Sequence, residues 1–424
     1  MNEDVLQYIC QTQSFNQENL QTTDQQELQL FSPGKLNTGG GADFSDARIK
    51  LDGLLWSGDV EIHTYASHWL QHNHHKDPKY DRVVLHVVWQ EDQQIHRRDG
   101  TTIPTLVLKE YLSEDWYGRY QHLLNSLALV PCETYLSHVD SLAVTDSIEQ
   151  ALIERLEAKA AEVLDILAGQ KGDWERASLI WLFTGFGFKK NKAAFQQLAQ
   201  CLDLSVLRKL QSATEVEAYL FGMSGLLPAT ATDEYVINLI SEFNWQDKKY
   251  GVKAKAMVAV WWQFMRMRPA NFPTLRLAQL ATFLYLNRSF LRTMLEAEPD
   301  RLMTIFQMGQ HEFWQQHYHF RAKARRKITG MGSESQNSLL INVVAPVLVA
   351  YGQAAGQPAY VAKAVQLLET LKPEVNRITR AWTNLGIEPQ NAAESQGLLG
   401  LFNDFCKKSR CLSCSIGKNI LQPI

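Results

Sequence analysis

Residues 41–65, GADFSDARIKLDGLLWSGDVEIHTY, decide the fold of the first part of this chain. Apolar and charged side chains alternate over residues 47–51, which is the pattern of a strand with one buried face. Asp52 and Gly53 form a dipeptide that is typical of a two-residue hairpin turn. The chain then returns through residues 54–65, so the stretch predicts a pair of antiparallel strands.

The segments on either side extend this pair into a mixed α/β domain. Residues 4–13 carry apolar side chains at helical spacing, and residues 28–31 form a brief strand candidate. Residues 66–76 predict a short helix, and residues 82–89 are a continuous apolar run that is typical of a strand buried on both faces. Residues 105–108 predict an edge strand. The expected order is therefore helix, strand, strand, strand, helix, strand.

The remainder of the chain is expected to be helical. A long amphipathic helix begins near Asp146 and Ser147, and further helical segments follow at short intervals without a fixed repeat period. A regular solenoid is therefore not supported. We expect an α/β domain over residues 1–140 and a large all-α domain over residues 141–424.

Composition excludes some classes of protein. The 424 residues have a net charge of -3, and 45% are hydrophobic, which argues against disorder and against a globally basic nucleic-acid binder. Glu3 and Asp4 stand where a secretory signal would place cations, and the longest apolar stretch, residues 339–351, is interrupted by Asn342 and Pro346. We expect a cytoplasmic protein without a membrane partner.

The paired strands also contain candidates for catalysis. An aspartate, a glutamate and a histidine that meet on neighbouring strands can hold a divalent cation and a water molecule. With a two-residue turn and regular pairing, Asp43 falls on the face away from Glu61 and His63. A bulge or a three-residue turn would bring these side chains together, and Gly58 predicts a bulge near that position.

Motifs along the whole chain resemble those of a known family. They are residues 32–34 (SPG), 56–63 (WSGDVEIH), 221–227 (FGMSGLL), 266–273 (RMRPANFP) and 410–414 (RCLSC). Together they resemble a bacterial family known as domain of unknown function 2851, whose name implies no activity. Two positions depart from the family pattern: Ala42 stands where proline is usual, and Cys10 stands where tryptophan is usual.

The element order, together with Asp43 and Glu61-x-His63, also resembles the core of PD-(D/E)xK nucleases, a restriction-endonuclease-like fold. That resemblance implies that Asp43, Glu61 and the carbonyl of Ile62 bind Mg²⁺ or Mn²⁺. His63 replaces the usual lysine and would orient or deprotonate water. The implied activity is metal-dependent phosphodiester hydrolysis of nucleic acid. The alternative is a degraded nuclease core that serves as a non-catalytic scaffold for binding nucleic acid or protein.

Histidines are unusually dense after the second strand. Seven of the 12 lie between residues 63 and 96: His63, His68, His72, His74, His75, His86 and His96. A helix would place His68 and His72 on one face, where they could share a zinc ion with His86. A zinc-dependent hydrolase is therefore a further alternative. His86 is also a candidate ligand of the Mg²⁺ or Mn²⁺ site, and a satisfied core histidine is the simpler interpretation.

Three cysteines cluster near the C-terminus. Cys406, Cys411 and Cys414 have the spacing of three thiolate ligands, which fits structural zinc or an iron–sulfur cluster. A fourth ligand is needed, and Cys132, Cys201 or a histidine could supply it. Three reduced structural cysteines are the alternative.

Basic residues in the helical part predict contacts with nucleic acid. They are Arg266, Arg268, Arg321, Lys323, Arg325, Arg326 and Lys327. The last five fall within seven residues and follow aromatic side chains, so that they could hold a phosphate backbone while the aromatic rings stack on bases. A solvated helix face is the alternative interpretation.

Overall fold

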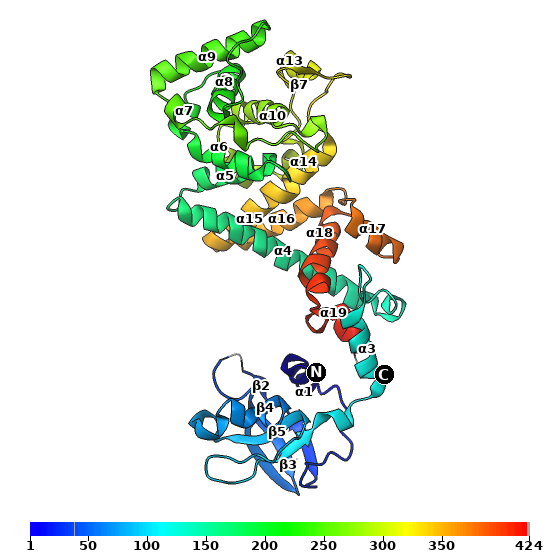
Figure 1. The fold of residues 1–424 in the computed structure, drawn as a ribbon. Coiled ribbons are helices and arrows are strands. Elements are labelled where there is room, and N and C mark those ends of the chain that lie inside the picture. The colour runs from blue at the N-terminus through cyan, green and yellow to red at the C-terminus, as the bar shows by residue number, and fades with distance from the viewer. Residues whose placement is uncertain (38, 422–424) are drawn as a thin grey trace. The chain divides into compact units, whose positions relative to one another are not determined.

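The computed structural model describes residues 1–37 and 39–421 (Figure 1). The chain divides into two compact units, and the division falls at different residues from those expected from the sequence. Unit 1 contains Met1–Ser147 together with the C-terminal tail from Leu401, and unit 2 contains Ile148–Gly400. The tail, which was expected to end the helical domain, thus groups with the α/β part.

A six-stranded mixed sheet forms the centre of unit 1. Its strands are β1 (Leu28–Ser32), β2 (Lys35–Leu36), β3 (Phe44–Leu51), β4 (Leu54–Tyr65), β5 (Val83–Gln90) and β6 (Thr105–Val107). The order is β1-β3-β4-β5-β6, with β2 also paired to β3. β3 is antiparallel to β1 and β4, whereas β5 runs parallel to β4 and β6. The predicted α/β fold class is confirmed.

Helices and turns complete this unit. The helices are α1 (Glu3–Thr12), α2 (His68–Gln71), α3 (Glu114–Asn125) and α19 (Ser415–Ile420). The apolar face of α1 is buried, as its helical spacing predicts. The crossover between β4 and β5 differs from the single helix expected over residues 66–76. The α-helical part of the crossover is only α2, because Asn73 has a left-handed backbone (φ 61°) that interrupts the helix. A 3₁₀ turn at His74–Lys76 follows.

The β3–β4 hairpin contains a bulge near Gly58, as the sequence predicts. The turn has two residues, Leu51 pairs with Leu54, and Ala47 pairs with Gly58. The register then shifts, so that Phe44 pairs with Val60. The extra residue lies on β3, beside Asp46 with its left-handed φ of 56°. Continued one residue past Phe44, this register places Asp43 opposite Glu61, so that both side chains lie on the same face of the sheet.

Gly58 is not the extra residue of the bulge, because it pairs with Ala47, and its lack of a side chain has another use. A Cβ atom at this position would overlap the carbonyl oxygen of Arg82 and the side chain of Val84. The missing side chain lets the segment leading into β5 lie close against β4, which is a known reason for glycine within a strand.

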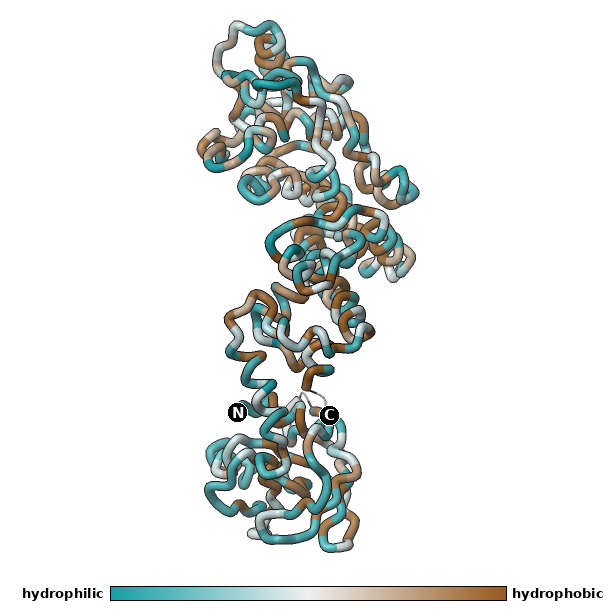
Figure 2. Tube along the Cα trace, turned by 90° about the vertical axis from the view of Figure 1, so that its right-hand side faces the viewer, coloured by the Kyte–Doolittle hydropathy of each residue, from teal (hydrophilic) through white to brown (hydrophobic). Residues whose placement is uncertain are grey.

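Unit 2 is built of helices. They are most of α4 (Ser141–Gly169), then α5 (Trp174–Phe186), α6 (Lys192–Cys201), α7 (Leu204–Leu207), α8 (Ala213–Ser224), α9 (Glu234–Tyr250), α10 (Pro273–Leu286), α11 (Phe290–Glu296), α12 (Pro299–Thr304), α13 (Glu312–Gln316), α14 (Ser333–Leu339), α15 (Ala345–Ala355), α16 (Pro358–Thr370), α17 (Arg377–Asn384) and α18 (Ala392–Gly400), with a small hairpin of β7 (His317–His319) and β8 (Ala322–Lys323). Hydrophobic and hydrophilic residues alternate along these helices (Figure 2). One large apolar core joins them.

One helical segment of unit 2 is apolar enough to cross a membrane by length and composition. It spans Ser333–Ala355, and 67% of its most apolar window is buried inside the structure. Its central residues belong to the apolar core of unit 2. Packing against the other helices of the unit therefore accounts for its hydropathy.

A buried carboxyl group lies within this helical core. Glu217 on α8 accepts a short hydrogen bond from the indole Nε1 of Trp314, which also lies 3.1 Å from the hydroxyl of Tyr235. Burial raises the pKa of Glu217 to about 7, although the hydrogen bonds from Tyr235 and Trp314 act in the opposite direction. The folded protein therefore binds the Glu217 proton more tightly than the unfolded chain does.

The first prediction concerns the pH dependence of stability. Because the folded pKa of Glu217 is raised, its contribution to stability is present below about pH 4.5 and lost as pH rises through about 7. Glu217→Gln should remove this loss, which is on the order of 3 kcal/mol. We expect the wild-type free energy of unfolding in urea to fall more between about pH 5 and pH 8 than that of the variant. Equal slopes, or the same flattening in the exposed control Glu234→Gln, would contradict the assignment.

Candidate metal centre

Strands β4 and β5 bring three polar side chains into a buried position. Glu61 and His63 lie two residues apart on β4, so that both point to the same face of the sheet. The parallel register pairs Glu61 with His86 of β5. The exposed fractions of Glu61, His63 and His86 are 5%, 1% and 0%. Buried polar groups require partners, and the neighbouring crossover segment supplies them.

The crossover segment places two further imidazoles against His63. His72 follows directly after α2, and its Nδ1 lies 3.2 Å from Nε2 of His63. The left-handed Asn73 then turns the chain so that His74 faces the same point. One ring nitrogen from each of His63, His72 and His74 lies within 4.8 Å of the other two. Three imidazoles therefore surround a space of the size that a metal ion needs.

Glu61 places a carboxylate oxygen against two of these imidazoles. Its Oε1 lies 3.2 Å from Nε2 of His74 and 3.6 Å from Nε2 of His63. The other carboxylate oxygen, Oε2, accepts a hydrogen bond from the backbone N–H of Asp43 at 3.0 Å. Three nitrogens and one carboxylate oxygen are a donor set that suits zinc and other transition-metal ions.

Burial favours the neutral form of two imidazoles, those of His63 and His86. Burial, followed by the nearby rings of His86 and His74, lowers the pKa of His63 far below its usual value. Burial is also the main cause that lowers the pKa of His86 to about 3. Only a neutral imidazole has a free lone pair for a metal, so burial holds His63 in the form that can bind one.

His86 supports His63 from the side opposite to His72. Its Nε2 lies 2.8 Å from Nδ1 of His63, which leaves Nε2 of His63 directed at the imidazole group. Such a contact to the second nitrogen of a metal-binding histidine fixes the ring orientation. Nδ1 of His86 is buried without a hydrogen-bond partner among the described residues. His86, which the sequence predicted as a ligand, thus contacts the far nitrogen of His63 and is not part of the imidazole group. His74 is part of that group instead.

Asp43 lies beside Glu61, as the predicted convergence requires. Its Oδ2 accepts a hydrogen bond from the backbone N–H of Ile62 at 2.9 Å, and its Oδ1 accepts one from Nε2 of Gln7 at 2.8 Å. Burial and then the charge of Glu61 raise the pKa of Asp43 to about 7. Asp43 and Glu61 therefore share one polar pocket, in which the Asp43 oxygens are already hydrogen-bonded.

The other histidines of this stretch have different surroundings. Nδ1 of His68 lies 3.2 Å from the carboxylate of Glu3, although its ring also neighbours His72. His96 lies outside the cluster, and its Nδ1 is 3.3 Å from the Thr102 hydroxyl. The sequence had assigned no role to His74. The break of the helix at Asn73, which brings His74 into the site, was not expected.

The predicted nucleic-acid contacts lie in unit 2. The seven basic side chains are exposed, and none of them forms an ion pair with another described residue. Lys323, Arg325, Arg326 and Lys327 line part of a cavity of about 450 Å³. The aromatic residues before them pack on the core of unit 2: Trp314 is buried, and Tyr318 and Phe320 are half-buried. The exposed charges can therefore contact phosphates, but Trp314 is not available to stack on bases.

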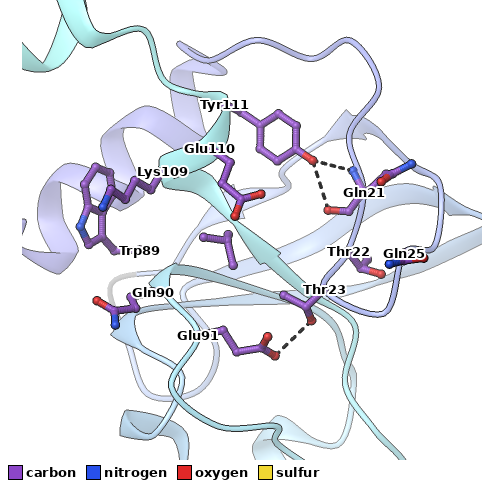
Figure 3. A pocket seen from close by; sticks show the side chains of 11 residues that line it. Gln21, Thr22, Thr23, Gln25, Trp89, Gln90, Glu91, Lys109, Glu110 and Tyr111 are labelled. Carbon is purple, nitrogen blue, oxygen red and sulfur yellow. Dashed lines mark hydrogen bonds between the residues drawn. The ribbon is translucent and has the colours of Figure 1, made fainter.

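A larger cavity of about 700 Å³ lies elsewhere in unit 1, by the last residues of β5 and β6. Figure 3 shows Tyr111 hydrogen-bonded to the backbone of Gln21, and Thr23 hydrogen-bonded to Glu91, at its wall. None of the clustered histidines lines it. We place the candidate site at the imidazole group because that is where ligand atoms converge.

Comparison with known proteins places the chain in a family. A family model described as "Protein of unknown function (DUF2851)" matches residues 3–377, and so ends before the 410–414 motif. No curated protein and no solved structure matches the chain. Because the matched residues cover most of the sequence, the chain belongs to the DUF2851 family.

Proposed function

We propose that this protein is a metal-dependent hydrolase that cleaves phosphodiester bonds in nucleic acid. Glu61, His63, His72 and His74 would bind the metal. The observation that carries the proposal is the convergence of three imidazole nitrogens, with the Glu61 carboxylate against two of the rings, at a site that runs from buried His63 to exposed His72. Burial lowers the pKa of His63 and raises that of the neighbouring Asp43, and perturbed groups of this kind are typical of functional sites.

The donor set favours particular metals. Magnesium prefers oxygen ligands and keeps several of its waters, whereas imidazole suits zinc and other transition metals. Mn²⁺ remains compatible because it accepts both nitrogen and carboxylate ligands. We therefore infer Zn²⁺ or Mn²⁺ as the resident ion, rather than the Mg²⁺ that the PD-(D/E)xK resemblance implies.

Two observations support phosphodiesters as the substrate class. The sheet combines the antiparallel strands β1, β3 and β4 with a crossover and the parallel strand β5. Asp43 precedes β3 and Glu61 lies on β4, which agrees with the resemblance to PD-(D/E)xK nucleases. The exposed basic side chains of unit 2 could hold a phosphate backbone.

The chemistry follows from the surroundings of each ligand. A bound divalent ion would lower the pKa of a coordinated water and polarise a phosphoryl oxygen. His63 would bind through Nε2 and donate its Nδ1 hydrogen to Nε2 of His86. Asp43 holds Glu61 in place through its backbone N–H. The pocket is thus organised before any substrate arrives, and this lowers the cost of stabilising developing charge.

The second prediction is that the protein binds Zn²⁺ or Mn²⁺ with one dominant site in unit 1. His72→Ala and His74→Ala should each weaken binding by at least about 100-fold, since each removes a direct ligand, whereas loss of an outer-shell partner typically costs 10–100-fold. Isothermal titration of Mn²⁺ would measure this, because thiolates compete poorly for this ion. His96→Ala is the matched control, since this histidine lies in the same unit but contacts Thr102. Unchanged binding in both ligand variants would exclude the site.

The third prediction concerns activity. With Mn²⁺ the protein should hydrolyse bis(p-nitrophenyl) phosphate and cleave single- or double-stranded DNA or RNA. Glu61→Gln should reduce the rate by about 10²–10³-fold, because the neutral amide no longer supplies a carboxylate ligand. His96→Ala should retain activity. Metal binding and tight nucleic-acid binding without cleavage of any substrate would instead favour the non-catalytic scaffold.

A further inference from the structure

Four cysteines that are far apart in the sequence belong to the same compact unit. Cys132 lies between α3 and α4, whereas Cys406, Cys411 and Cys414 lie in the C-terminal tail. None of them forms a disulfide, and Cys406 is the only one of the four that is not fully buried. Cys201 belongs to unit 2, so it is not part of this group.

Specific hydrogen bonds hold the tail against the start of α4. The Ser147 hydroxyl lies 3.5 Å from Sγ of Cys414 and accepts a hydrogen bond from the backbone N–H of Ile416 at 3.0 Å. The side chain of Asn419 accepts one from the N–H of Asp140 at 3.3 Å. These contacts bring the tail to the segment that carries Cys132.

Short turns set the positions of the tail sulfurs. Cys406 and Cys411 each open a 3₁₀ turn, and Cys414 directly precedes α19. A side chain at Gly417 would overlap the carbonyl of Cys411, so the absence of a Cβ permits this tight fold. The tail backbone therefore forms short turns at the three cysteines instead of continuing as one helix.

The thiols are near enough to affect one another. Burial raises the pKa of Cys132 to about 12, and the nearby thiols of Cys414 and Cys411 raise it further. Burial also raises the pKa of Cys406, with Cys132 as the next cause. Without a metal, several thiolates at this spacing repel one another, and a bound cation would remove that repulsion.

We propose that Cys132, Cys406, Cys411 and Cys414 form a tetrathiolate site for a thiophilic metal centre, which fastens the C-terminal tail to unit 1. Cys132 supplies the fourth ligand that the tail spacing lacks. This site is separate from the imidazole group and does not depend on the proposed hydrolase activity.

The spacing of the sulfurs bears on the kind of metal centre. Among the described residues, the imidazole group has its ligand atoms within 4.8 Å of one another, and the cysteine sulfurs form no group that tight. A single zinc, with Zn–S bonds of about 2.3 Å, would require the four sulfurs to move together. An iron–sulfur cluster places several irons between its ligands and fits a wider opening. The geometry therefore favours an iron–sulfur cluster over zinc.

The fourth prediction tests this site on the full-length chain with His72→Ala and His74→Ala, so that the imidazole group contributes no metal. Protein purified without oxygen should contain iron and sulfide with visible charge-transfer absorbance, whereas zinc in their place would support the four-thiolate site and contradict the preference for a cluster. Cys132→Ser should lose most of this metal, whereas Cys201→Ser, in unit 2, should keep it.

Thiol alkylation of the wild-type, full-length chain gives a readout that does not depend on a variant folding. Cys132 and the three tail cysteines should resist iodoacetamide until the metal is removed, and then react together, and the tail should become sensitive to protease. Metal-free protein after anaerobic purification, full metal content in a folded Cys132→Ser variant, or disulfides among the four cysteines would each overturn the proposal.

Discussion

The parallel pairing of β4 with β5 is the interaction on which the candidate site depends. It sets Glu61 beside His86 and buries both next to His63, within a sheet whose other members are mainly apolar. Leaving such polar groups without partners would cost several kcal/mol each. Each of the three side chains has a partner: His63 contacts His86, and the Glu61 carboxylate contacts His74 and the N–H of Asp43. A register shift of one residue would turn them to the opposite face and remove the site.

The arrangement combines two ideas that the sequence suggested separately. The strand pair provides the carboxylates Asp43 and Glu61, as a magnesium-type site would, while the crossover provides His72 and His74, as a zinc-type site would. In the structure Glu61 contacts His63 and His74, whereas the Asp43 oxygens accept hydrogen bonds from Gln7 and Ile62. Asp43 holds Glu61 and the start of β3 in place, and the imidazoles provide most of the donor atoms. A centre with mostly nitrogen donors suits an ion that binds imidazole better than Mg²⁺ does.

Much of the fold could be predicted from local sequence patterns, because alternation and turn residues act over a few positions. The β3–β4 hairpin, the buried strand β5 and the edge strand β6 were all expected. A bulge near Gly58 was expected as well, but its extra residue on β3 was not, since it depends on a left-handed Asp46 that no local signal indicated. The role of His74 was missed for a similar reason, because Asn73 interrupts a pattern that favours a continuous helix. Selecting Cys132 required knowledge of contacts across more than 270 residues, which no local pattern contains.

X-ray absorption at the manganese edge of the Mn²⁺-loaded protein tests the central claim most directly. The account predicts a first shell with three imidazole nitrogens, from His63, His72 and His74, and oxygen from Glu61 and water. The multiple scattering that identifies imidazole should decrease by about one third in His74→Ala. A shell of oxygen atoms alone, or a spectrum that is the same in the His74→Ala variant, would contradict the proposed centre.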